Sequence, residues 1–335
     1  MPRSYKMIYV PVDNSGHSFA AIDLAVDLAT KFDAAIIGSH VFAAGVTESY
    51  LDLMEECCRT ASVRFERRAL GGRHHQALLD DISQEAYDLV VMGALGAGAV
   101  DESQIGSVTE RVVRGVATDV LVVKDLIPAE GSILAAVDGS TPSLDALCAA
   151  LSFGSATGRS VEGIVVADRP LASATSTALD SARARAAAEG TEMEIIVTEG
   201  KPFDRLLKMS REKKPWLLVV GKTGADTEQD DARSSLGSTT GNLLRMAPCN
   251  ILITPGAKVA REPVRAAEPV AASKQSPAAR RQFRWTPDAE RLLEDVPQEQ
   301  RMEVIRTVEE GAFKLGVSVI TAETIDRVML GYIDS

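Results

Sequence analysis

The fold is decided by the stretch Leu89-Val90-Val91-Met92-Gly93-Ala94-Leu95-Gly96, which Gly106-Ser107 follows after nine further residues. An unbroken apolar run that ends in glycines is typical of a strand buried on both faces, as in a parallel sheet covered by helices. The glycines let the backbone approach a ligand closely and adopt positive φ angles. Gly106-Ser107 then opens a helical stretch at 107–116, whose first N–H groups and dipole favour an anion. The stretch therefore predicts a phosphate cradle at a strand end.

The same spacing also has a purely structural interpretation. The glycines would then make a tight turn, and Ser107 would only cap the helix. In the phosphate-binding interpretation, the hydroxyl groups of Ser107 and Thr109 donate to phosphate oxygens. One such motif alone leaves the two interpretations open.

A long internal repeat divides the chain. Two polar motifs recur in the same order. Val12-Asp13-Asn14-Ser15 with Ser18 recurs as Val137-Asp138-Gly139-Ser140 with Ser143. Gly106-Ser107-Val108-Thr109 recurs as Gly237-Ser238-Thr239-Thr240. The repeated unit is the size of a domain and longer than any solenoid repeat. The sequence therefore predicts two duplicated domains, at 1–127 and 130–256.

Each duplicated unit alternates short Val/Ile runs with longer amphipathic stretches. In the first unit the expected strands are 7–12, 34–42, 62–69, 88–92 and 119–123, and the expected helices are 18–32, 47–60, 74–86 and 107–116. A βαβ series of this kind predicts a doubly wound α/β domain. Such domains bind ligands outside the carboxyl ends of the strands, at the topological switch point.

The composition excludes several classes of protein. The 335 residues are 45% hydrophobic and 25% charged, as in ordinary soluble proteins, and the net charge of −11 argues against a nucleic-acid partner. No apolar run approaches the ~20 residues that span a bilayer, and the N-terminus lacks the apolar region of a signal peptide. The four cysteines have no metal-ligand spacing. We therefore expect a cytoplasmic protein with reduced thiols and no membrane association.

The two motifs together resemble the ATP-binding branch of the universal stress protein family, over residues 5–125 and 131–256. For each half the resemblance implies a five-stranded parallel sheet of order 3-2-1-4-5, with ATP across the strand ends. We expect that Mg²⁺ can accompany the ATP. It implies that Asp13 contacts the nucleoside end and that the backbone at Val41 meets the adenine edge. The ribose and phosphates would be held by Gly93, Gly96, Gly106 and Ser107. The matching residues of the second half are Asp138, Val166, Gly221, Gly224, Gly237 and Ser238.

The second half departs from this pattern. Twelve residues, Ala225 to Leu236, separate its second and third glycines, and four of them are acidic. Carboxylates repel a triphosphate unless Mg²⁺ intervenes or the loop turns outward to water, so occupancy of the second site is less secure. Lys222 follows the first glycine, but no P-loop is present because Trp216 stands where another glycine is required. We expect Lys222 to be a surface lysine.

The sequence contains no recognisable catalytic set. His17 is expected on an exposed loop, with phosphate contact as the alternative, and His40 is expected beside the adenine site. His74 and His75 are expected at a solvated helix start without metal-ligand spacing. We therefore expect a nucleotide-binding regulatory module with at most slow ATP hydrolysis. The alternatives are an ATP-hydrolysing or nucleotidyl-transferring enzyme and a structural adaptor with empty clefts.

A different composition begins after the duplicated region. Residues 257–282 are rich in Ala, Pro and basic residues and poor in large apolar ones, which predicts a flexible linker. Residues 283–335 predict a small domain of three helices, the last opened by Thr321. Their pattern resembles the small C-terminal domain of light-independent protochlorophyllide reductase, which implies a docking module for a protein partner. Trp285 is expected to be a core aromatic, with a tetrapyrrole contact as the alternative.

The predicted topology also predicts how the halves assemble. The fifth strands, Val120–Val123 and Ile251–Thr254, are expected at sheet edges, where an unpaired strand invites pairing. The family resemblance implies antiparallel pairing of these edges, and the short connection favours pairing within one chain. We expect an intramolecular pseudo-dimer, so that a higher homo-oligomer would have to use other surfaces. Leu121→Pro is expected to remove a ladder donor and separate the halves.

Overall fold

The computed structural model describes most of the duplicated region and short parts of the C-terminal region. The described residues are 3–13, 15–42, 49–96, 105–124, 130–167, 173–188, 190, 193–224, 236–256, 284–286, 292, 308 and 319–329. The predicted linker at 257–282 therefore lies outside the described residues. Contacts divide the chain into two compact units, Met1–Val264 and Arg265–Ser335.

The first half of the larger unit alternates strands and helices as the sequence predicts. Its elements are β1 (Met7–Pro11), α1 (Gly16–Phe32), β2 (Ala35–Phe42), α2 (Ser49–Thr60), β3 (Phe65–Gly71), α3 (His74–Gln84), β4 (Leu89–Gly93), α4 (Ser107–Gly115) and β5 (Asp119–Val123).

The second half repeats the same series. Its elements are β6 (Ile133–Val137), α5 (Thr141–Thr157), β7 (Val161–Ala167), α6 (Ser173–Ala188), β8 (Glu194–Glu199), α7 (Pro202–Lys213), β9 (Leu217–Gly221), α8 (Ser238–Met246) and β10 (Asn250–Thr254).

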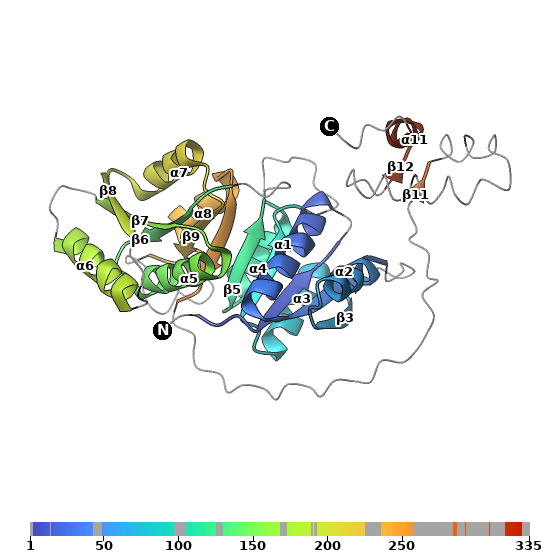
Figure 1. Ribbon diagram of the computed structural model, residues 1–335, viewed down its shortest axis with the longest axis horizontal. Helices are drawn as coiled ribbons and strands as arrows, with labels where there is room; N and C mark the ends of the chain where they lie inside the picture. The colour runs from blue at the N-terminus through green and yellow to red at the C-terminus, as the bar shows by residue number, and fades with distance from the viewer. Residues whose placement is uncertain are drawn as a thin grey trace. The chain divides into compact units, whose positions relative to one another are not determined.

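All ten strands form one sheet, with the order β3-β2-β1-β4-β5-β10-β9-β6-β7-β8 (Figure 1). Within each half the pairing is parallel and follows the order 3-2-1-4-5, which confirms the predicted doubly wound fold. The strand order reverses between β1 and β4 in the first half and between β6 and β9 in the second. These two switch points are where such a sheet leaves room for a ligand.

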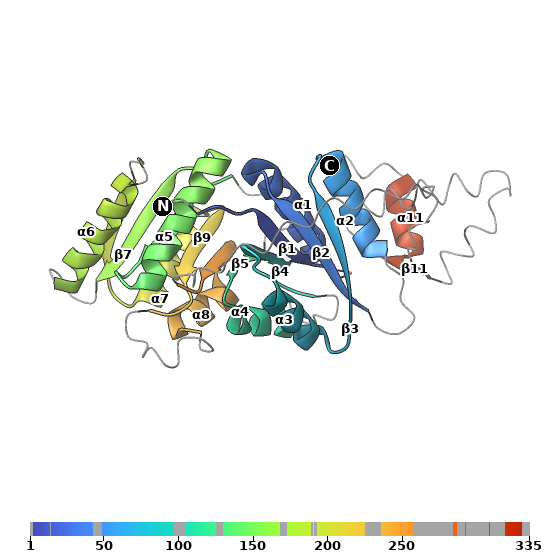
Figure 2. The ribbon, with the colours of Figure 1, turned by 90° about the horizontal axis from the view of Figure 1, so that it is seen from below.

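Helices cover both faces of the sheet (Figure 2). One core contains side chains of α1, α2, α5 and α6, and the other contains side chains of α3, α4, α7 and α8. Strand β4 supplies both cores: Leu89 and Val91 belong to the first, and Val90 and Met92 to the second. This alternation explains why β4 is apolar at successive positions and does not alternate with polar residues.

The two halves meet at the fifth strands. β5 and β10 pair antiparallel, with Leu121 opposite Leu252, so the predicted edge pairing is present. The backbone of Ala94, just beyond β4, donates to the carbonyl of Val123 at 2.8 Å. The N–H and C=O groups of successive residues alternate in direction along a strand. The backbone groups of Leu121 therefore point toward β4, as those of Val123 do, and the backbone groups of Val120 and Val122 point toward β10. The expectation for Leu121→Pro is therefore wrong in its mechanism, because the lost donor faces β4.

Val122→Pro is the substitution that acts on the junction itself. We expect it to speed hydrogen exchange at the amide of Ile251, its partner on β10, because one of the bonds joining the strands is lost. Leu121→Pro is the matched control, since it introduces the same residue one position away on the other side of the strand. Equal acceleration at Ile251 in both variants would contradict this assignment of the ladder.

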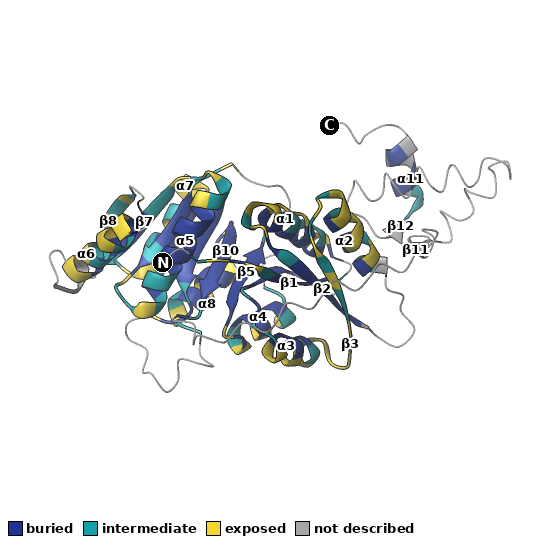
Figure 3. Ribbon diagram, turned by 60° about the horizontal axis from the view of Figure 1, so that its bottom comes forward, coloured by how far each residue is buried: buried dark blue, intermediate teal, exposed yellow. Residues whose placement is uncertain are grey.

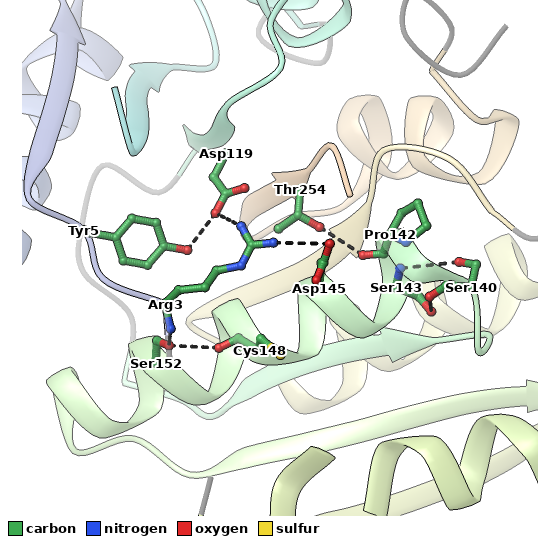
Figure 4. A network of polar contacts seen from close by, with 10 residues as sticks. All are labelled: Arg3, Tyr5, Asp119, Ser140, Pro142, Ser143, Asp145, Cys148, Ser152 and Thr254. Carbon is green, nitrogen blue, oxygen red and sulfur yellow. Dashed lines mark hydrogen bonds and ion pairs between the residues drawn. The ribbon is translucent and has the colours of Figure 1, made fainter. Parts of the chain in front are cut away.

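The N-terminal segment also joins the halves (Figure 4). The guanidinium group of Arg3 bonds the carboxylate of Asp119 at the start of β5 and lies 3.8 Å from that of Asp145 on α5. Its backbone N–H donates to the hydroxyl of Ser152 on α5 at 2.8 Å, and the hydroxyl of Tyr5 donates to Asp119 at 2.8 Å. Helix α5 itself is buried along most of its length, whereas α6 has an exposed face (Figure 3).

In the smaller unit, β11 (Arg284–Trp285) and β12 (Val319–Ile320) pair in parallel, and α11 (Ala322–Met329) follows. Thr321 caps α11 by accepting a hydrogen bond from the backbone of Thr324 at 3.2 Å, so the predicted start of the last helix is confirmed. The two short strands were not predicted. Most of the other two expected helices lies outside the described residues, as does the side chain of Trp285. No described helix is long and apolar enough to cross a membrane.

Candidate functional site

A cleft of about 420 Å³ opens at the β1–β4 switch point of the first half. Six of its lining residues are those that the sequence analysis selects, namely Asp13, Val41, Gly93, Gly96, Gly106 and Ser107. They come from the ends of β1, β2 and β4 and from the start of α4, so four separate elements converge. The volume lies within the range of small-molecule sites, about 300–1,000 Å³.

The glycines are needed because two loops approach each other closely. A Cβ at Gly96 would lie 2.8 Å from Oδ2 of Asp13, and one at Gly93 would lie 2.7 Å from the backbone of His17. Neither residue is among the glycines with positive φ, so that part of the sequence interpretation is wrong. The hydroxyl of Ser15 donates to Asp13 at 2.6 Å and lies 3.0 Å from the carbonyl of Leu95, which ties the loops together.

The serines of the repeated motif shape the loop after β1. Ser15 caps α1 by accepting from the backbone of Ser18 at 3.1 Å, and the hydroxyl of Ser18 accepts from the backbone of Asp13 at 2.9 Å. The backbone N–H of Ser15 also donates to Oδ1 of Asp13 at 3.0 Å. These bonds hold the Asp13 carboxylate at the edge of the cleft.

The N-terminus of α4 forms the phosphate end of the cleft. Gly106 is its N-cap and, having no side chain, satisfies none of the free N–H groups of the first turn. Its own N–H donates to the carbonyl of Ala94 at 2.8 Å, and Ser107 is exposed. Glu110, in the same turn, pairs with Arg114 and Arg245, and the hydrogen bond from Arg114 leads the effects that lower the Glu110 pKa. The first turn therefore presents N–H groups and a positive dipole end to the cleft.

Thr109 differs from its predicted role. It lines the cleft, but it is buried and its hydroxyl donates to the carbonyl of Gly93 at 2.9 Å. Thr240 makes the equivalent bond to Gly221 at 2.7 Å. A hydroxyl has one proton to donate, so these threonines fasten the helix to the preceding strand and do not donate to a phosphate.

The base end of the cleft lies beyond the end of β1. The last register pair between β1 and β2 is Pro11 with Ser39, and the N–H of Val12 donates to the carbonyl of Ser39 at 2.8 Å. By the alternation of backbone directions, the N–H and C=O of Val41 point to the same side as those of Ser39, past the paired part of β1. That edge has the donor and acceptor that an adenine edge requires.

Three residues at this end were missed or only partly foreseen. His40 is buried with Nδ1 at 2.6 Å from the carbonyl of Val12, and its ring packs against Tyr50 with centroids 5.3 Å apart. Burial, followed by the negative charge of Asp13, raises the pKa of Tyr50. His74 is exposed and lines the cleft from the start of α3, a position that the topology alone could have indicated. His17 is half-buried in α1 and is not among the residues that line this cleft.

The second half repeats part of this geometry. A Cβ at Gly224 would lie 3.1 Å from Oδ2 of Asp138, and Gly237 is the N-cap of α8, directly before Ser238. The N–H of Gly237 donates to the carbonyl of Lys222 at 2.9 Å. Gly221 and Val166 stand at the ends of β9 and β7, in the places of Gly93 and Val41. Most of the acidic loop, residues 225–235, lies outside the described residues.

Lys222 is not the surface lysine that the sequence suggested. Only 3% of its surface is exposed, and its ammonium group donates to the carbonyls of Arg114 at 2.6 Å and Val116 at 3.2 Å, at the C-terminus of α4. Lys124 makes the reciprocal contact, donating to the carbonyl of Ala247 at the C-terminus of α8 at 2.7 Å. Each half thus caps a helix of the other with a lysine, at the negative end of its dipole.

Lys222→Met should destabilise the junction. We expect a loss of about 1–3 kcal/mol in the free energy of unfolding, because two carbonyls lose a buried charged donor. Burial, followed by the charge of Arg114, lowers the pKa of Lys222 to about 8. In the unfolded chain a lysine titrates near ~10.4, so the unfolded state binds more protons between these values and wild-type stability rises with pH there. Chemical denaturation at pH 7 and 9.5 tests both effects, and the difference between wild type and variant should grow at the higher pH. Lys124→Met, at a half-buried lysine, is the matched control.

Comparison with known proteins gives a consistent result. The profile of the universal stress protein family matches residues 43–124 and 131–255. A universal stress protein of Methanocaldococcus jannaschii is 29% identical over 140 residues, covering 36% of this chain and 82% of the relative. Two crystal structures share the fold of the duplicated region. One is a functionally unknown protein of Pseudomonas aeruginosa, with a TM-score of 0.59 and 15% identity, covering 75% of this chain and 92% of its own. The other is a universal stress protein of Archaeoglobus fulgidus, with a TM-score of 0.57 and 20% identity, covering 74% and 97%.

Proposed function

Because the chain belongs to the universal stress protein family, we propose that its first half binds ATP at the β1–β4 switch point and that the nucleotide controls association with a protein partner. The observation that carries the proposal is the uncapped N-terminus of α4, which faces a cleft closed on the other side by Gly96 and Asp13. Free N–H groups at a helix start suit phosphates, and the backbone edge of Val41 suits the adenine.

The glycines of the cleft also support a nucleotide. Side chains at Gly96 and Gly106 would occupy the space between the two loops, and Gly106 would bring a Cβ to 3.2 Å from the carbonyl of Ala94. Their absence leaves backbone N–H groups open to a ligand. Among the described residues no group of three or more His, Cys, Asp or Glu side chains could hold a metal ion. Any Mg²⁺ would therefore enter with the phosphates, with its remaining positions filled largely by water.

The second cleft is a weaker candidate within the same proposal. It keeps the Asp138–Gly224 approach and the glycine cap of α8, but Asp138 is exposed and the loop between them is longer and acidic. We propose that one ATP binds per chain, in the first half. The partner would dock through the C-terminal segment 283–335, in a regulatory role in the stress response.

Release of the bound molecule tests the ATP assignment. The purified chain is denatured gently, and the released small molecules are identified and quantified by mass spectrometry. One ATP per chain supports the proposal, and release of no adenine nucleotide contradicts it. Phosphate release above that of a Gly106→Val variant would favour the alternative of an ATP-hydrolysing enzyme.

Capture experiments test the regulatory part separately. The immobilised full chain is incubated with cell extract with and without ATP, beside Gly106→Val under the same conditions. The set of captured proteins should change with ATP for the wild type only. An unchanged set would remove nucleotide control while leaving ATP binding intact.

A further inference from the structure

A second cavity lies where the two halves of the larger unit meet. It also measures about 420 Å³, and its lining comes from both halves: His17, Ala94, Leu95, Ile105, Lys124, Arg211, Arg245, Met246, Ala247 and Pro248. Leu95 lines both this cavity and the nucleotide cleft, so the two are neighbours across one loop.

The cavity concentrates positive charge. Lys124, Arg211 and Arg245 line it together with His17, and no described lining residue is acidic. These residues come from the end of β5, from α7, from α8 and from α1, which are far apart in the sequence. The chain as a whole has a net charge of −11, so a cavity lined by three cationic side chains differs in sign from the rest of the protein.

The two arginines of the cavity keep donors available for a ligand. Arg245 donates through one nitrogen to Glu110 at 2.6 Å and through another to the carbonyl of Gly241 at 3.4 Å, and Lys124 donates to the carbonyl of Ala247 at 2.7 Å, which fixes both side chains in place. A guanidinium has five N–H donors, so further donors remain on Arg245. Arg211 is exposed, and no described carboxylate lies within ion-pair distance of it.

We propose that this junction cavity binds a small polyanion with two or more phosphate or carboxylate groups, separately from the nucleotide. Arg211 and Arg245 form the charged contacts, Lys124 and His17 add to the potential, and Ile105, Met246 and Pro248 form an apolar wall. Paired arginines suit such groups because each guanidinium can bond two oxygens at once. Because both halves line the cavity, a bound polyanion would also strengthen their junction.

Two methionines allow the two cavities to be observed separately. Met92 lines the nucleotide cleft and Met246 lines the junction cavity, where 51% of its surface is exposed. The full chain with ¹³C-labelled methionine methyl groups is titrated with pyrophosphate at low salt. The Met246 signal should shift with saturation, and the apparent affinity should fall as the salt concentration rises. ATP should shift the Met92 signal.

Variants identify the contacts. Arg211→Ala and Arg245→Gln should each weaken the response at Met246 about tenfold. Lys208→Ala is the matched control, because Lys208 lies on the same helix as Arg211 but does not line the cavity, and it should change the affinity less than twofold. Three outcomes would overturn the proposal: no shift at Met246 with millimolar pyrophosphate, a shift at Met92 alone, or equal effects of Arg211→Ala and Lys208→Ala. Failure of ATP to bind would leave the result at Met246 unaffected.

Discussion

Gly106→Val should lower the affinity of the first half for ATP at least 100-fold, or about 2.8 kcal/mol of binding free energy. A Cβ at this position would lie 3.2 Å from the carbonyl of Ala94 and 3.5 Å from the backbone nitrogen of Gly96. The two methyl groups of valine would then crowd the gap between the glycine loop and the start of α4. The phosphates need that gap in order to reach the first N–H groups of the helix.

The fold should tolerate this change. Gly106 has φ −62° and ψ 140°, which any residue adopts without strain, and its side is open to the cleft. Thermal melting should therefore shift by only a few degrees while equilibrium dialysis with ATP shows the loss. Gly237→Val is the matched control in the second half, where a Cβ would lie 3.3 Å from the carbonyl of Lys222. Undiminished ATP retention in Gly106→Val would remove the site assignment.

The sheet and its switch points were predictable because their signals are local. The continuous apolar run at 89–92 divides between the two cores, as a strand of a covered parallel sheet must. The repeated loop motif could be read in the same way, since Ser15 and Ser140 each cap the helix that follows. Both signals depend only on near neighbours in the sequence. They can therefore be recognised without any knowledge of the tertiary structure.

A predicted strand boundary is wrong where a turn, and not the apolar pattern, determines where the strand begins. The sequence extends the third strand to 62–69, but Ser62 has φ +58° and ends α2 in the left-handed conformation, so β3 begins only at Phe65. Val63 is apolar because it packs against the core from the turn, not from the strand. The strands β11 and β12 were missed because two-residue pairings between distant segments leave no periodicity to detect.

The site was misjudged at residues whose partners come from elsewhere in the fold. Lys222 resembles a loop lysine until the second half is placed beside the C-terminus of α4. Thr109 resembles a phosphate ligand until its hydroxyl is seen to bond the strand end at Gly93. A single sequence shows only which residues neighbour a polar group along the chain. It does not show a carbonyl group that another helix or strand places beside that polar group in the fold.

Arg3→Met should cost about 3–5 kcal/mol of unfolding free energy, because it leaves the fully buried carboxylate of Asp119 without a cation. The Arg3 side chain is 13% exposed and that of Asp119 is 0% exposed, so water cannot replace the lost partner. The hydroxyl of Tyr5 would remain as a donor to one oxygen, but the other oxygen has no hydrogen-bond partner even in the intact network. Urea denaturation of the full chain measures the loss.

Two further variants distinguish the cost of leaving the buried Asp119 carboxylate without a cation from the general effect of removing an arginine. Arg183→Met removes an exposed arginine that lies 3.9 Å from Asp180, and it should change stability by no more than about 0.5 kcal/mol. The combination of Arg3→Met, Tyr5→Phe and Asp119→Leu removes the fully buried carboxylate together with both of its donors and should recover most of the loss, because the carboxylate that remains, Asp145, is 20% exposed. A triple variant no more stable than Arg3→Met would contradict this account, because removal of the Asp119 carboxylate would then have recovered nothing. The cost of Arg3→Met would then come from the lost contacts of Arg3 itself, and not from the penalty of leaving Asp119 alone.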